Sequence, residues 1–165
     1  MAGRAPPRGS PAPCGEAAVR AAALRLLARR EHSRAELRRK LCRGGRPEAL
    51  VERVLEALAR EGLQDDRRFA EAYLRSRRER GYGPLRVAVE LRQRGVDREL
   101  VERVLAEEGE AEGPWAAVLE RARRQRFGAA RPRDEAERAR QARFLQQRGF
   151  PLALVLEALG EAAPE

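Results

Sequence analysis

The hexapeptide LVERVL occurs at residues 50–55 and again at residues 100–105, and the similarity extends beyond it on both sides. LCRGGRPEALVERVLEAL (41–58) aligns without a gap with LRQRGVDRELVERVLAEE (91–108), and FPLALVLEAL (150–159) follows the same pattern of apolar positions. A chance similarity between two amphipathic helices would not be expected to include the glycine that ends the preceding helix in both segments. The match is typical of tandem helical repeats, whose units bury their apolar faces against their neighbours. The sequence therefore predicts three copies of one small unit.

Start and stop signals divide each unit into three helices. Ser33 followed by Glu36 has the spacing of a capping box, and Pro84 suits the first turn of a helix because its missing N–H would be unpaired there anyway. Further candidate N-caps are Asp65 or Asp66, Asp97 and Asp134. Isoleucine, threonine and asparagine are absent, while the abundant Ala, Leu, Arg and Glu favour helices. We therefore expect an all-α fold of three tandem three-helix repeats, stacked into an elongated, curved array.

These signals also set the expected boundaries. A disordered tail rich in Pro and Gly should occupy residues 1–16, followed by repeat 1 at 17–62, repeat 2 at 63–109 and repeat 3 at 110–165. The residues of repeat 2 expected to face inward are Phe69, Ala70, Tyr73 and Leu74 on its first helix and Leu85, Val87, Ala88 and Leu91 on its second.

The formal charge of +9 and the sequence pI near 11.0 suggest an anionic partner, with nucleic acid as the first choice. A coding bias is the competing explanation, because Lys40 is the one lysine among 35 basic residues. The surplus is concentrated in residues 17–62, which hold 12 basic and 6 acidic side chains. Repeat 1 is therefore the first place to look for a phosphate-facing surface.

The sequence carries no recognisable set of catalytic or metal-binding residues. His32 is the only histidine and lies between two predicted helices, and Cys14 and Cys42 lack the neighbours that a zinc site requires. We expect both thiols to be reduced. No apolar run approaches the ~20 residues that span a bilayer. We expect a soluble, cytoplasmic monomer that has no cofactor and is not an enzyme.

Binding is the remaining class of function. Arginines that flank the apolar stripes of repeat 2 are candidates for phosphate or carboxylate contact, because a guanidinium group matches both. They are Arg75 and Arg78, which should point away from the Phe69/Tyr73 stripe, and Arg86, Arg92 and Arg94. For any single one of them, a solvated helix face is an equally good interpretation. Trp115 and Phe144 fit apolar stripes and are expected in the core.

Repeat 2 also resembles a known signature. DDRRFAEAYLRSRRERGYGPLRVAVELRQRGV (65–96) is similar to the pattern of the RecX family of bacterial recombination regulators. The matching positions are Asp66, Arg68, Phe69, Ala70, Tyr73, Arg77, Gly81, Gly83, Arg86, Val87, Glu90, Leu91, Arg94, Gly95 and Val96. The chain departs from the family in having Arg94 where lysine is usual and valines such as Val87 where isoleucines are usual. The third repeat matches more weakly, and its ending is short.

The resemblance implies a regulator that binds the RecA filament on DNA and suppresses its recombinase, ATPase and coprotease activities. The five arginines above are then the expected contacts with RecA or DNA, supported structurally by Phe69, Tyr73, Leu91 and Leu105. Many modest contacts along a long partner would add through avidity. A general DNA- or RNA-binding helical module without a RecA target is the alternative, and a protein scaffold with no nucleic-acid link is a third hypothesis.

Overall fold

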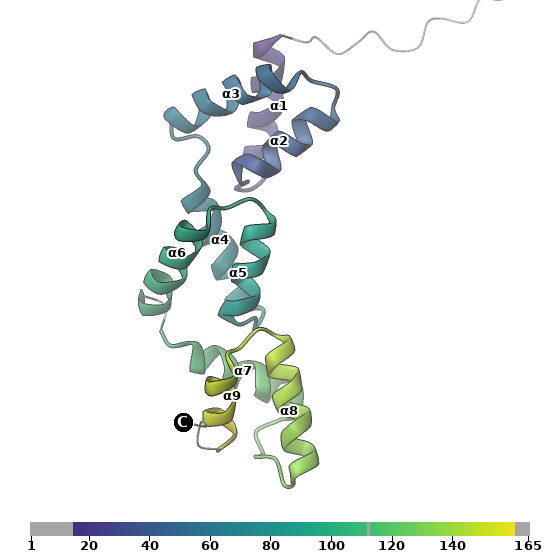
Figure 1. Cartoon of the computed structure of the whole chain (residues 1–165), viewed down its shortest axis with the longest axis vertical. Helices are drawn as coiled ribbons and strands as arrows, with labels where there is room; N and C mark the ends of the chain where they lie inside the picture. The colour runs from purple at the N-terminus through teal and green to yellow at the C-terminus, as the bar shows by residue number, and fades with distance from the viewer. Residues whose placement is uncertain (1–14, 112, 161–165) are drawn as a thin grey trace, which may run out of the picture. The chain divides into compact units, whose positions relative to one another are not determined.

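The computed structural model describes residues 15–111 and 113–160, and within them the chain forms nine helices and no strand. The chain divides after Asp65 into two compact units. Of the predicted disordered tail, residues 1–14 lie outside the described part, and Cys14 lies there too. The helices are α1 (Glu16–Leu27), α2 (Arg34–Arg43), α3 (Glu48–Arg60), α4 (Asp66–Glu79), α5 (Pro84–Gln93), α6 (Arg98–Ala111), α7 (Trp115–Phe127), α8 (Glu135–Gln147) and α9 (Leu152–Leu159) (Figure 1). In the described residues, no helix has the length and apolar character that a membrane span requires.

The predicted all-α fold of tandem three-helix repeats is confirmed. In each repeat the third helix packs against both of the others: α3 against α1 and α2, α6 against α4 and α5, and α9 against α7 and α8. Two residues after the end of each second helix stands a glycine with positive φ, which is 77° at Gly45, 80° at Gly95 and 89° at Gly149. A side chain would be strained in this left-handed conformation. The repeated glycine stop in the sequence is thus a repeated backbone turn.

The first unit holds repeat 1 and buries one apolar cluster. Its buried members are Val19, Ala22, Ala23, Leu37, Leu41, Val51, Val54, Leu55 and Leu58. Ser33 caps the start of α2, because the backbone N–H of Glu36 donates to Ser33 Oγ at 3.1 Å. Pro47 lies immediately before Glu48, the first residue of α3.

The second unit holds repeats 2 and 3 with one apolar cluster each. The buried members are Phe69, Ala70, Leu74, Val87, Leu91, Val96, Val101 and Val104 in the first cluster and Val118, Leu119, Ala122, Leu145, Phe150, Val155 and Leu159 in the second. Trp115 packs against both clusters. Leu85, which was expected to face inward, is 55% exposed. At 3.6 residues per turn it lies about 160° around α5 from the buried Val87, so the inward prediction was wrong.

Repeats 2 and 3 meet through their backbones. Arg148 and Gly149, at the end of α8, place their carbonyl oxygens on the start of α5, where they accept from the N–H groups of Gly83 at 2.8 Å and Leu85 at 3.0 Å. These donors lie where a helix start leaves N–H groups without intrahelical acceptors. A Cβ atom on Gly83 would lie 2.4 Å from the oxygen of Gly149. The stacking predicted between neighbouring repeats is therefore present here, and it depends on glycine at the contact.

Candidate partner-binding interface

A single carboxylate on α5 gathers polar side chains from two helices. Glu90 accepts at Oε2 from the hydroxyl of Tyr73 at 2.6 Å, and its Oε1 accepts from Nε of Arg86 at 3.0 Å. Nε of Arg77 lies 2.8 Å from Oε2, and the same guanidinium donates to the Tyr73 oxygen at 2.8 and 2.9 Å. The carboxylate is only 13% exposed, so these bonds form in a partly desolvated place where they are stronger than in water.

Four arginines near Glu90 in the fold lie over the rings of Tyr73 and Tyr82. The guanidinium carbon of Arg94 is 4.5 Å from the centroid of the Tyr73 ring. The Tyr82 ring carries Arg86 at 4.6 Å and Arg148 at 4.8 Å, with Arg77 at 5.1 Å. Cation–π contacts of this length hold a guanidinium group in place while leaving its N–H groups to other partners.

We call this set of side chains the Glu90 cluster: Tyr73, Arg77, Tyr82, Arg86, Glu90, Arg94 and Arg148. It combines four guanidinium groups with one carboxylate, which leaves a local surplus of positive charge. Arg86 is 45% exposed and Arg77 is 19% exposed, so the cluster reaches the surface. Planar guanidinium groups that are already oriented suit phosphate or carboxylate groups of a partner.

The cluster also fixes the protonation states of its own members. Burial acts to raise the pKa of Glu90, but the hydrogen bonds from Tyr73 and Arg86 and the nearby positive charges outweigh it, so the pKa is lowered. Burial and the hydrogen bond to Glu90 raise the pKa of Tyr73. At neutral pH, Glu90 is therefore ionised, Tyr73 is protonated, and the charge of the cluster does not change.

Next to the cluster, the outer face of α5 combines apolar and positive side chains. Leu85 and Val89, one helical turn apart, are 55% and 44% exposed. Arg86 and Arg92 are exposed on the same helix, and the side chain of Arg92 makes no hydrogen bond or ion pair within the described part of the chain. Protein interfaces are enriched in arginine and in exposed apolar groups that become buried on binding.

The structure brings together some of the predicted site residues and separates others. Arg86 and Arg94 belong to the Glu90 cluster, and Arg92 lies on the outer face of α5. Arg75 is 45% exposed on α4 and lies 3.5 Å from Glu108 of α6. Among the supporting residues, Phe69 and Leu91 are buried in the core of repeat 2, and Leu105 packs against it.

Arg78 requires a correction. It was expected to present its charge to a partner, but it is only 5% exposed. Its guanidinium carbon lies 4.4 Å from the Trp115 ring centroid, and its Nη2 donates to the carbonyl oxygen of Gly113 at 2.8 Å. The side chain is therefore enclosed between α4 and the start of repeat 3, and we remove it from the candidate interface.

Among the charged members of the Glu90 cluster, the sequence did not identify three as site residues: Arg77, Glu90 and Arg148. Arg77 and Glu90 stand in the family signature, but nothing in their spacing shows that Glu90 collects two guanidinium groups. Arg148 could have been found, because FLQQRGF (144–150) repeats the register of ELRQRGV (90–96) and aligns Arg148 with Arg94. Both arginines lie on aromatic rings: Arg94 on Tyr73, and Arg148 on Tyr82.

Comparison with known proteins gives a consistent result for all three repeats. Models of the first, second and third three-helix domains of RecX match residues 20–58, 65–105 and 116–159. A regulatory protein RecX of Halorhodospira halophila is 54% identical over 145 residues, which cover 88% of this chain and 88% of that protein. A regulatory protein RecX of Pseudomonas entomophila is 46% identical and covers 84% of this chain and 87% of its own length.

Solved structures share the fold. The crystal structure of RecX from Lactobacillus salivarius superposes with a TM-score of 0.73 at 19% identity, covering 87% of this chain and 94% of that one. A second crystal structure, of a regulatory protein RecX, gives a TM-score of 0.72 at 22% identity and covers 87% and 72%. The predicted arrangement of three-helix repeats therefore also occurs in experimental structures.

Proposed function

The chain belongs to the RecX family of regulatory proteins, and we propose that it binds the DNA-bound filament of the RecA recombinase and lowers the recombinase, ATPase and coprotease activities of that filament. It acts by binding, as a monomer, without catalysis and without a cofactor. The place of action is the cytoplasm, where the filament forms on DNA. Its relatives are named as regulators, and the high identity over most of the chain supports a regulatory role here too.

The observation that carries this proposal is the Glu90 cluster with the outer face of α5 beside it. A RecA–DNA filament offers both acidic protein surface and phosphates, and a cluster with four oriented guanidinium groups and one carboxylate fits either of them. Exposed Leu85 and Val89 add an apolar contact that a bare phosphate backbone would not use. The combination favours a protein–DNA assembly over naked DNA.

Inhibition follows from differential binding. A protein that contacts adjacent protomers through several modest contacts binds the assembled filament better than it binds free RecA. Binding can shift an equilibrium only by its difference in affinity between two states. Inhibition therefore requires that the protein bind most tightly to a state of the filament that extends or hydrolyses ATP more slowly.

The test is the DNA-dependent ATP hydrolysis of RecA from the same organism, titrated with the protein at two salt concentrations. We expect inhibition at well below one molecule per RecA protomer. Unchanged hydrolysis with folded protein would contradict the proposal.

A pair of double variants locates the interface. Arg86→Ala with Arg92→Ala changes the outer face of α5 and should raise the inhibitory concentration roughly tenfold, because two guanidinium contacts are lost. Arg98→Ala with Arg103→Ala removes the same charge from exposed positions of α6 and should leave inhibition within about twofold. Equal effects from the two pairs would remove α5 from the interface.

The alternative, a general DNA- or RNA-binding module, is favoured by the net charge of +9. It predicts a gel shift on naked DNA that weakens steeply with salt and does not change when RecA is present. Binding that requires RecA on the DNA would exclude this alternative and also distinguish the protein from a scaffold without a nucleic-acid link.

A further inference from the structure

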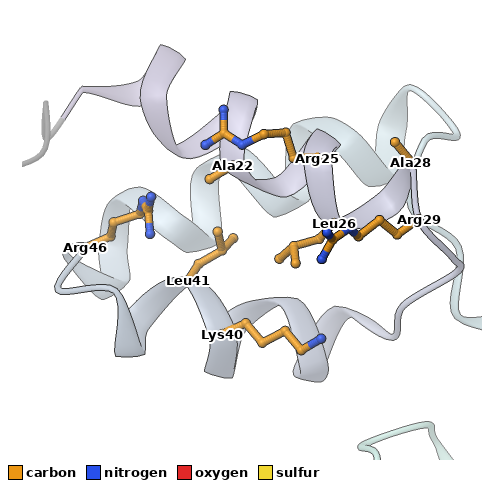
Figure 2. Close-up of a pocket in the computed structure, with 8 residues that line it drawn as sticks. All are labelled: Ala22, Arg25, Leu26, Ala28, Arg29, Lys40, Leu41 and Arg46. Carbon is orange, nitrogen blue, oxygen red and sulfur yellow. The ribbon is translucent and has the colours of Figure 1, made fainter.

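A groove in the first unit lies between α1 and α2, well apart in sequence from the Glu90 cluster. Its volume is about 580 Å³ (Figure 2). The lining residues are Ala22, Arg25, Leu26, Ala28, Arg29, Lys40, Leu41 and Arg46. Half of them are basic, half are apolar, and no carboxylate lines the groove. We call it the α1–α2 groove.

The floor of the groove is apolar. Leu41 is 1% exposed and Ala22 is 8% exposed, and both belong to the core of repeat 1. Leu26 packs against this core and is only partly buried. In Figure 2 the side chains of Leu26 and Leu41 lie between the two helices. An apolar group placed here would extend the existing core and lose contact with water.

The arginines of the groove lack the ion-pair partners that their neighbours have. Arg20, Arg34 and Arg38 of the same unit form ion pairs with Glu61, Glu52 and Glu48, respectively. Arg25, Arg29 and Arg46 form no ion pair with any residue of the described part of the chain. The groove therefore concentrates positive charge that the protein itself does not neutralise.

Lys40, the only lysine of the chain, is held in position at the groove. Its Nζ lies 3.0 Å from Nε2 of His32, and Nδ1 of His32 lies 3.0 Å from the carbonyl oxygen of Arg30. Because a carbonyl oxygen only accepts, Nδ1 donates, and Nε2 then accepts from the ammonium group. His32 is 2% exposed, so a buried ring fixes the position of an exposed positive charge. Such pre-organisation lowers the entropy cost of binding.

We propose that the α1–α2 groove binds an acidic peptide segment of a partner protein, in which apolar side chains stand between carboxylates. The apolar side chains contact Leu26 and Leu41, and the carboxylates pair with the surrounding arginines and Lys40. Phosphates of a nucleic acid would meet the charge but not the apolar floor. The groove consists of residues of the first unit alone, so its binding of a peptide does not depend on the filament proposal.

Fluorescence anisotropy with the full-length chain and three labelled probes tests the proposal. The probes are the peptide EDLEDLFED, the peptide EDSEDSSED and a single-stranded 12-mer oligonucleotide. The first two carry equal charge, so their difference isolates the apolar contact. We expect the first peptide to bind roughly tenfold more tightly than the second, because its leucine and phenylalanine side chains leave water.

Two matched double variants assign the binding to the groove. Arg25→Gln with Arg46→Gln should weaken binding of EDLEDLFED about five- to tenfold, because two charge-assisted contacts are lost. Arg39→Gln with Arg53→Gln removes the same charge from exposed positions outside the groove and should change it less than about twofold. Circular dichroism checks that both variants fold, and Arg29→Gln serves as a second groove variant if the first does not.

Three results would overturn the proposal. Equal binding of the two peptides, or equal losses from the two double variants, would mean general charge attraction. If the oligonucleotide bound more tightly than both peptides, and only the groove variants weakened its binding, the groove would be a phosphate-binding site. The ATP hydrolysis assay on the same variants is read separately, so a failure here leaves the filament proposal standing.

Discussion

Arg78 lies over the indole ring of Trp115, with its guanidinium carbon 4.4 Å from the ring centroid, and so joins repeat 2 to repeat 3. The same guanidinium donates to the carbonyl oxygen of Gly113, and Nη2 of Arg121 donates to the carbonyl oxygen of Arg78 at 2.6 Å. A charged side chain thus occupies a position that an apolar residue would normally fill in stacked repeats. Its burial is tolerable because the ring and the carbonyl group both stabilise the cation.

Replacing Arg78 should therefore damage the fold. We expect Arg78→Ala to lower the free energy of unfolding by about 2–4 kcal/mol, since a desolvated cation–π contact and a charged hydrogen bond are lost together. Urea denaturation followed by circular dichroism measures this. Arg75→Ala, on the exposed side of the same helix, is the matched control and should cost less than about 1 kcal/mol. Similar losses from both variants would show that the contact with Trp115 is unimportant.

The sequence was sufficient for the repeat architecture because its signals are local. Glycine stops, N-caps and the spacing of apolar residues each depend on a few neighbours, and together they predicted the all-α fold of tandem three-helix repeats. The Glu90 cluster was beyond such reasoning, since it joins α4, α5 and the end of α8 through pairings of side chains. The periodicity of one helix does not say which carboxylate an arginine of another helix meets.

The burial of Arg78 could have been predicted, because its position on the helix indicates it. It follows the buried Leu74 by four residues, which places both on the same face of α4. Arg123 follows Leu119 by four residues in the same way and is 0% exposed. In a chain where nearly all basic residues are arginine, charge is a poor guide to exposure. The position of an arginine relative to the apolar stripe of its helix is a better guide to its exposure.

The backbone contact between repeats 2 and 3 gives a second prediction. Gly83→Ala should destabilise the second unit by about 3 kcal/mol or more: its φ of −87° suits alanine, but the new Cβ would overlap the backbone of Gly149. Gly160→Ala is the opposite case, with a φ of 85° and open space around the new atom, and should cost about 1 kcal/mol. Thermal unfolding of both variants tests the order, and the reverse order would rule out a close contact.

Acid should weaken repeat 3 through a carboxylate on α7. Hydrogen bonding from Arg123 and Arg124 lowers the pKa of Glu120 to about 2, from an ordinary value of 4.5. Because the folded pKa is depressed, the stabilisation is complete above pH 4.5 and is lost as the pH falls from 4.5 towards 2. We expect a loss of about 2 kcal/mol across this window, measured by urea denaturation.

The variant Glu120→Gln isolates this effect. It should be less stable than the parent at pH 6, and the difference should shrink as the pH falls, because the parent loses the same interactions by protonation. Glu135→Gln is the control, since this carboxylate is 81% exposed and pairs only with Arg138 among the contacts described. A constant difference between Glu120→Gln and the parent at every pH would contradict the lowered pKa.

The single histidine gives the last prediction. Burial lowers the pKa of His32 below its ordinary value of 6.5, and the charges of Arg30 and Lys40 act in the same direction. Folding therefore favours the neutral ring, so stability is complete above pH 6.5 and declines as the pH falls below it towards the folded pKa. A proton on Nε2 would also remove the acceptor that holds Lys40 at the α1–α2 groove. Nuclear magnetic resonance titration of the lone imidazole should give a midpoint below 6.5, and unfolding of His32→Gln should lack the decline. A midpoint at or above 6.5 would contradict the lowered pKa of His32 and, with it, the expected decline in stability.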